Sequence, residues 1–235
     1  MGKTKKKHSK YPAIVGGQVL DSSMDSMEET RFRKRNQKLT ISLSEKLHFT
    51  YSEVECLLLI FYKLQKESKE FKLGVDKTLF RDVLHCSLKM TEDYLMDRIF
   101  YTLDKGPSPY MTMETWAASL SLFLKGTLEE KMQYCYKVYD ALGEKLLGRE
   151  TMFHLLRKSL LSLSGEEDAE ESAKEMIEVL TKKMDIDRDG KISFNDYRQT
   201  ILKQPMLLEV FGQCLPTREN IHAFMTTFAQ KPGKM

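Results

Sequence analysis

The chain has 235 residues, of which 41% are hydrophobic and 30% are charged, and its formal net charge is +3 at pH 7. These proportions are ordinary for a globular protein that buries one core or two small lobes. The longest apolar run, Cys56–Tyr62, is too short to cross a bilayer, and the start of the chain lacks the apolar stretch of a secretory signal. Lys6 stands where a myristoylation signal needs Ser or Thr. We therefore expect a cytosolic protein without a membrane anchor.

Residues 1–38 carry a net charge of +6 and few large apolar side chains. This composition predicts a disordered basic arm. Such an arm attracts polyanions, of which the acidic tails of tubulin are one candidate, and it serves equally well as a solubilising tail. We expect no specific nucleic-acid binding.

The four cysteines are far apart and include no C-x-x-C pair, which argues against a zinc cluster or a disulfide framework. Each of them lies in a segment with helical periodicity. Buried, reduced thiols are the expected state of Cys56, Cys86, Cys135 and Cys214.

An internal repeat runs along the chain from residue 39. Three amphipathic helices each end at an aspartate, are followed by about a dozen residues, and lead into a second apolar helix. The aspartates are Asp104, Asp140 and Asp185, and the eighth residues counted from them are the apolar Met111, Leu147 and Ile192. In a helix–loop–helix hand, that eighth residue forms a short antiparallel bridge to the partner loop, so we expect Leu147 to pair with Ile192.

The repeat predicts an all-α fold of the EF-hand superfamily, with two lobes of paired hands and mostly degenerate loops. An earlier helix pair around residues 51–88 supplies the fourth hand. The expected parts are a basic arm over 1–38, an N-terminal lobe with two degenerate hands over 39–125, a C-terminal lobe over 126–204, and a C-terminal helix and tail over 205–235.

The sequence DIDRDGKISFND, Asp185–Asp196, has the spacing of a calcium-binding loop. A hard dication takes six to eight oxygen ligands from fixed positions of such a loop, and Gly190 permits the sharp turn at the sixth position. The predicted ligands are the carboxylates of Asp185, Asp187, Asp189 and Asp196, the hydroxyl of Ser193 or a water that it holds, and the backbone carbonyl of Lys191.

Asp196 ends this loop where a longer Glu is usual. The shorter side chain favours coordination through one oxygen, which weakens Ca²⁺ binding and makes Mg²⁺ a possible occupant. We predict one weak calcium site with a dissociation constant near or above ~10⁻⁵ M.

The second and third loops lack metal-binding chemistry. In the second loop the positions that should carry carboxylates or a flexible glycine hold Gly106, Pro109 and Thr115. In the third loop they hold Leu142, Lys145 and Thr151. Both loops keep apolar flanking helices, which indicates a scaffold whose shape is retained.

Three stretches resemble the calaxin family of EF-hand proteins: Leu120–Asp140, Lys182–Tyr197 and Met206–Pro216. The resemblance extends over about Gln37 to Pro216. It implies association with outer-arm dynein or its docking complex in the axoneme of a motile cilium or sperm flagellum. The family pattern implies metal-competent second and third loops, so the degenerate loops here are those expected of a paralogue within the family.

No P-loop, nucleophile elbow or dinucleotide fingerprint is present in the sequence, and we expect a non-catalytic protein that binds a partner helix in an apolar groove. A general cytosolic adaptor, or a regulatory subunit of a phosphatase or kinase, is the alternative. A third possibility is self-inhibition, with Met206–Pro216 forming a short helix in the protein's own C-terminal groove.

Overall fold

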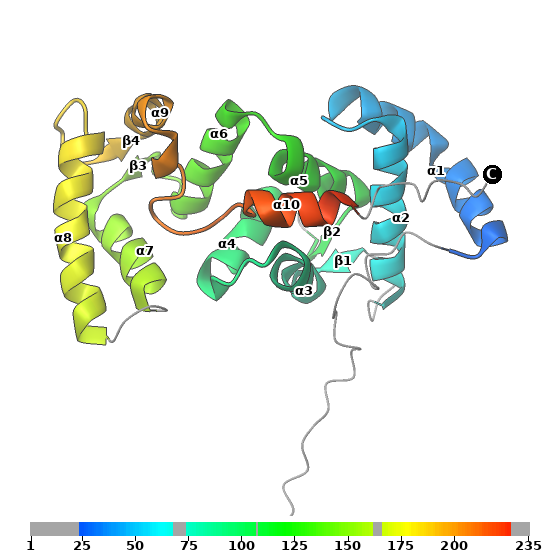
Figure 1. The fold of residues 1–235 in the computed structure, drawn as a ribbon, viewed down its shortest axis with the longest axis horizontal. Helices are drawn as coiled ribbons and strands as arrows, with labels where there is room; N and C mark the ends of the chain where they lie inside the picture. The colour runs from blue at the N-terminus through cyan, green and yellow to red at the C-terminus, as the bar shows by residue number, and fades with distance from the viewer. Residues whose placement is uncertain (1–23, 68–73, 107, 162–165, 227–235) are drawn as a thin grey trace, which may run out of the picture.

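The computed structural model describes residues 24–67, 74–106, 108–161 and 166–226, and this part of the chain is mostly helical (Figure 1). The expectation of an all-α EF-hand fold is confirmed. The first half contains α1 (Ser26–Lys46), α2 (Tyr51–Glu67), β1 (Val75–Asp76), α3 (Lys77–Leu88), α4 (Asp93–Leu103), β2 (Tyr110–Met111) and α5 (Met113–Lys125). The second half contains α6 (Leu128–Tyr139), β3 (Leu146–Leu147), α7 (Arg149–Leu161), α8 (Glu166–Met184), β4 (Ile192–Ser193), α9 (Phe194–Lys203), η1 (Pro205–Leu207) and α10 (Arg218–Met225).

Two short antiparallel ribbons join the hands in pairs. In the first half β1 pairs with β2, and Val75 lies opposite Met111. In the second half β3 pairs with β4, and Leu147 lies opposite Ile192, as the sequence predicted. All four of these side chains are fully buried, so the eighth loop residue both bridges the loops and contributes to the core.

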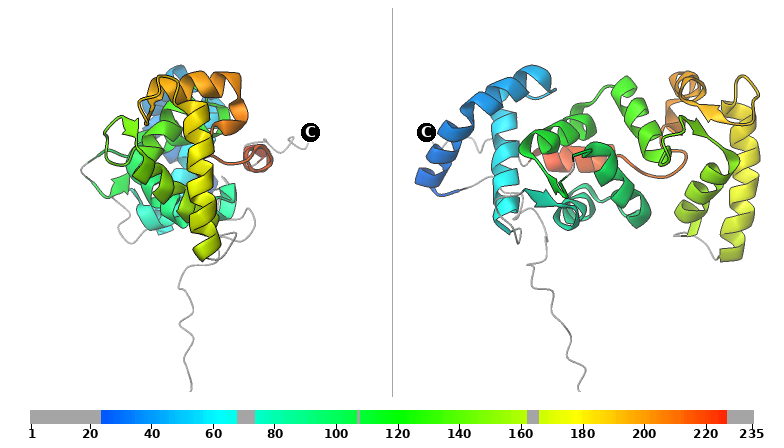
Figure 2. Two further views of the ribbon diagram at one scale, coloured as in Figure 1. Left: turned by 90° about the vertical axis from the view of Figure 1, so that its left-hand side faces the viewer. Right: turned by 180° about the vertical axis from the view of Figure 1, so that it is seen from behind.

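The molecule is elongated, with α1 and α2 at one end and the antiparallel pair α7 and α8 at the other (Figures 1 and 2). Helices α4 and α6 make contact between the two halves. Trp116 anchors the core of the first half, where its ring is fully buried and its Nε1 donates a hydrogen bond to the Leu57 carbonyl at 3.1 Å. The two pairs of hands therefore pack as neighbours along one axis.

The expected disordered arm over residues 1–38 is wrong for its second part, which belongs to α1. Phe32 is buried and its ring centre lies 4.9 Å from that of Tyr62 in α2. Arg33 also forms an ion pair with Glu55 of α2. A sparse apolar stripe is enough for this helix because α2 supplies the other half of the interface. The composition of residues 1–38 reflects the charged, solvent-facing side of α1 and does not reveal its apolar side.

Residues 1–23, which carry the first basic cluster, lie outside the described residues. So do residues 227–235 of the expected C-terminal tail. Within the part of the chain that is described, no helix is both long and apolar enough to span a bilayer.

The segment Met206–Pro216 does not form the expected helix beyond a single 3₁₀ turn. Gly212 adopts a φ of +127°, which an L side chain rarely takes, and Pro216 prevents a helix from continuing. The side chains of Phe211, Cys214 and Leu215 are buried. We call residues 205–216 the C-terminal strap.

Three tyrosines of the C-terminal lobe hold the C-terminal strap in place. The hydroxyl groups of Tyr134 and Tyr139 in α6 donate to the carbonyls of Cys214 at 3.1 Å and Gly212 at 2.8 Å, and Tyr197 in α9 donates to the carbonyl of Leu208. Beyond the strap, α10 contacts α3 and α5 of the first half (Figure 1). The segment thus contacts α6 and α9 of its own lobe and ties the two halves together, and its occupation of an inhibitory groove stays a prediction.

We predict that Phe32→Ala lowers the free energy of unfolding by about 3 kcal/mol, because a buried aromatic side chain is replaced by a cavity. Chemical denaturation of the full chain measures this change. Met27→Ala is the matched control in the same helix, since Met27 is 66% exposed and its loss should change stability by less than about 0.5 kcal/mol. Equal effects of the two changes would contradict the packing of α1 on α2.

Candidate metal centre

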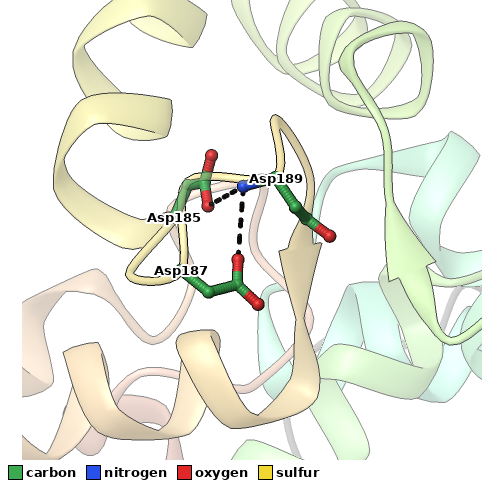
Figure 3. Close-up of side chains that lie close together, drawn as sticks. All are labelled: Asp185, Asp187 and Asp189. Atoms are coloured by element: carbon green, nitrogen blue, oxygen red, sulfur yellow. Dashed lines mark hydrogen bonds between the residues drawn. The ribbon is translucent and has the colours of Figure 1, made fainter.

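The carboxylates of Asp185, Asp187 and Asp189 converge in the loop between α8 and β4 (Figure 3). One candidate ligand atom from each lies within 4.8 Å of the other two. The first aspartate is half-buried and the other two are exposed to solvent. A cation approaching from solvent can therefore reach oxygen atoms of all three residues.

The backbone of the loop curls around the first aspartate. Asp185 accepts hydrogen bonds from the N–H groups of Asp189 at 3.1 Å and Gly190 at 2.8 Å. Asp189 in turn accepts from the N–H of Lys191 at 2.8 Å. Gly190 has a φ of +82° and Arg188 a φ of +62°, so the chain passes twice through the left-handed region within three residues. This curl keeps one carboxylate oxygen of each of the three aspartates within 4.8 Å of the other two.

Ser193 and Asp196 form a separate pair at the beginning of α9. The Ser193 N–H and hydroxyl donate to Oδ2 of Asp196 at 3.0 and 2.6 Å, and the Asp196 N–H donates back to the hydroxyl at 3.2 Å. This reciprocal arrangement is a capping box. Both hydrogen bonds to the Asp196 carboxylate end on Oδ2, so Oδ1 remains for a metal. This arrangement fits the predicted coordination of the metal through a single oxygen of Asp196.

The charge of the loop favours a cation. Loss of hydration first, and then repulsion by the carboxylates of Asp189 and Asp196, raise the pKa of Asp187. The predicted donors are all oxygen atoms, which suits a hard dication such as Ca²⁺ or Mg²⁺. The residues present therefore fit the predicted metal, and Asp185, Asp187 and Asp189 are the ones that the structure already brings together.

Loop three has the same backbone arrangement as loop four without the same chemistry. Asp140 accepts from the N–H groups four and five residues later, those of Glu144 at 3.0 Å and Lys145 at 2.9 Å. Lys145 has a φ of +61°, the conformation that Gly190 adopts at the corresponding place. The non-ligand side chain of Leu142 is 77% exposed. The loop has kept its shape after losing its ligands.

Loop two is less regular. Asp104 Oδ1 accepts from the N–H of Gly106 at 3.0 Å, and Tyr110 N–H donates to the Ser108 hydroxyl at 3.2 Å. Among the described residues, the three aspartates of loop four are the one group of acidic, His or Cys side chains spaced to hold a metal. That loops two and three bind no metal stays a prediction.

Tyr136 of α6 has a role that the sequence pattern does not reveal. Its hydroxyl lies 2.9 Å from the carbonyl oxygens of both Lys145 and Ile192, and so joins loop three to loop four. Burial raises the pKa of this tyrosine, which keeps the hydroxyl protonated. Periodicity indicates that such a ring is buried but cannot show which carbonyl its hydroxyl reaches.

The paired hands and the aspartate loop define the class of protein. Residues 129–202 match the model of the EF-hand domain pair, so this is a calcium-binding protein of the EF-hand superfamily. The chain is 43% identical over 206 residues to "Calaxin" of Bos taurus, a match that covers 86% of this chain and 97% of that protein. It is 41% identical to "Calaxin" of Danio rerio, with 83% and 97% covered.

The chain therefore belongs to the calaxin family. A more distant similarity, 27% identity over 58% of this chain and 65% of the relative, links it to "Guanylyl cyclase-activating protein 1" of Lithobates pipiens. The resemblance expected from the three sequence stretches is confirmed, and it extends over most of the chain.

We predict that the protein binds one Ca²⁺ per chain and that the combined change Asp187→Asn and Asp189→Asn abolishes this binding, because two charged ligands are neutralised. Isothermal titration calorimetry measures both stoichiometry and affinity. Asp140→Asn is the matched control in loop three and should leave the titration unchanged. A second calcium equivalent, or loss of binding in the control, would show that loop three also holds metal.

We further predict that Asp196→Glu tightens Ca²⁺ binding about tenfold, equivalent to ~1.4 kcal/mol. The longer side chain can bring both carboxylate oxygens to the metal, while glutamate is also the usual partner of serine in a capping box. The same calorimetric titration, repeated with Mg²⁺, should show a smaller gain. Submicromolar Ca²⁺ binding by the unaltered protein would refute the role given to Asp196.

Proposed function

We propose that the protein is a non-catalytic, calcium-modulated subunit of the ciliary or flagellar axoneme, associated with outer dynein arms or their docking complex. The observation that carries this proposal is the match to calaxins over 97% of their length. The match extends over 206 residues and is therefore far longer than a common calcium-binding loop. Localisation in the cytoskeleton and an axonemal partner follow from the same resemblance.

The structure supports a scaffold more than a strong calcium switch. Both ribbons are formed, with Val75 opposite Met111 and Leu147 opposite Ile192, although loops two and three lack ligands. Tyr136 connects loop three to loop four through hydrogen bonds that require no metal. A single weak site in such a frame acts as a modulator of binding, or as a structural Ca²⁺ or Mg²⁺ site. A contact between the basic residues before Ser26 and acidic tubulin tails is a further part of the proposal.

A general EF-hand adaptor, such as a regulatory subunit of an enzyme in the cytosol, is the alternative. The similarity to a relative named as an activator of guanylyl cyclase favours it, since that name describes regulation of an enzyme. The two functions use the same loop chemistry. They differ in where the protein is found and what it touches there.

We predict that the tagged protein, expressed in multiciliated cells, remains with axonemes after detergent extraction and cross-links to outer-arm dynein or docking-complex subunits. Cross-linking mass spectrometry on intact axonemes identifies these neighbours. A variant with Asp187→Asn and Asp189→Asn is expected to remain with the axoneme, because a scaffold role needs the ribbons and not the metal. Full release of the unaltered protein by detergent, with enzyme subunits as its cross-linked neighbours, would instead support the adaptor.

A further inference from the structure

A groove of about 750 Å³ lies between the two halves of the molecule. Its walls come from α4, α6, loop three and the first residue of α9. Apolar surface is provided by Tyr101, Leu142 and Phe194. Tyr101 is 63% exposed and Leu142 is 77% exposed, which is unusual for large apolar side chains so close together. The groove can take up apolar side chains of a ligand.

Positive charge surrounds this apolar surface. Arg98, Lys105, Lys137 and Lys145 line the groove, against one carboxylate, that of Asp140. The carboxylate is engaged inside its own loop by two backbone N–H groups. Arg98 is fixed by a hydrogen bond to the Tyr139 carbonyl at 2.6 Å. The three lysines are exposed to solvent, so their charges are available to a ligand.

Two side chains of loop three that differ from those of loop four form part of this surface. Leu142 stands at the third loop position, where loop four has Asp187, and Lys145 stands at the sixth, where loop four has Gly190. The loop backbone is held in the same curl by Asp140. A functioning loop would present carboxylates here. This loop presents an apolar side chain and a cation.

A second groove of about 480 Å³ continues from the first between α5 and α6. Thr102, Gln133 and Lys137 line both grooves. The continuation makes room for a segment of several residues instead of a single small molecule. Glu114 and Glu130 line this second groove, so an acidic ligand should direct its carboxylates toward the first groove.

The charge also excludes the protein's own terminal segments as occupants. Residues 1–23 contain five lysines and one aspartate, and residues 227–235 contain two lysines and no acidic side chain. Four cations around the groove would repel both segments. A partner with acidic side chains next to apolar ones is complementary to the groove in charge and in apolar surface.

We propose that this groove binds an acidic amphipathic segment of a partner protein, with its apolar side chains between Leu142 and Phe194 and its carboxylates next to Lys137 and Lys145. The inference rests on the proposed function only in one respect, because the groove would serve as a docking surface of the proposed scaffold. It stands on groove shape and charge, which are the same for an axonemal subunit and for an adaptor. Failure to find the protein in axonemes would therefore leave it unaffected.

Selection from a displayed library of random 16-residue peptides against the full chain tests this proposal. Enriched sequences are expected to combine Asp or Glu with Leu, Ile, Phe or Trp at helical spacing. The affinity of the most enriched peptide, labelled with fluorescein, is then measured by fluorescence anisotropy. It should fall at least tenfold in the variant Lys137→Glu with Lys145→Glu, and also in Leu142→Ser. Binding should weaken as salt is increased from 50 to 300 mM, because screened charges attract less.

The matched control is Lys174→Glu with Lys182→Glu, the same charge change on the exposed face of α8. It should leave peptide affinity within twofold of the unaltered chain, and circular dichroism melting should show that all variants are folded. Enrichment of basic or uncharged peptides, no enrichment, or equal loss in the control would overturn the proposal. Sedimentation showing a dimer that Lys137→Glu with Lys145→Glu dissociates would also overturn it, because a second copy would then occupy the groove.

Discussion

The short backbone pairing between Leu147 and Ile192 is the constraint on which the second half of the molecule depends. It joins loop three to loop four, which carries the three clustered aspartates. Both side chains are buried, so the pairing is held by the core as well as by hydrogen bonds. Tyr136 reinforces it from α6 through carbonyl oxygens on both sides. Loop three therefore supports loop four through its backbone shape, independently of any metal ligand of its own.

The parts of the molecule that could be predicted from sequence are the hands, the pairing of their loops and the cluster of aspartates. Helical periodicity and the position of the eighth loop residue identified the hands and the pairing of loops three and four. The spacing of Asp185, Asp187 and Asp189 identified the carboxylates that the structure brings within 4.8 Å of one another. These are local patterns, because the spacing of residues in one loop determines the structure of that same loop. Whether Lys191, Ser193 and Asp196 complete a metal site stays a prediction.

The features that were missed depend on contacts between distant parts of the chain. Phe32 is buried because α2 lies beside it, which no count of charged residues in the first 38 positions can show. The C-terminal strap is irregular because tyrosine hydroxyls in α6 and α9 satisfy its carbonyls, such as those of Gly212 and Cys214. A helix would have satisfied these groups internally. In the C-terminal strap tertiary hydrogen bonds thus take the place of local ones, whereas at the other end of the described chain tertiary packing buries one face of a regular helix.

The predicted metal ligand and the proposed docking surface share the first turn of α9. Asp196 lies two residues after Phe194, whose ring lines the groove, and directly before Tyr197, which holds the C-terminal strap. A change in the position of the Asp196 carboxylate therefore acts on the groove and on the strap through a single turn of helix. Because coupling between two binding sites is reciprocal, a partner that prefers one position of Phe194 would change metal affinity by the same factor. The predicted dissociation constant, near or above ~10⁻⁵ M, suits this arrangement, since a bound partner would then bring the site into a working range.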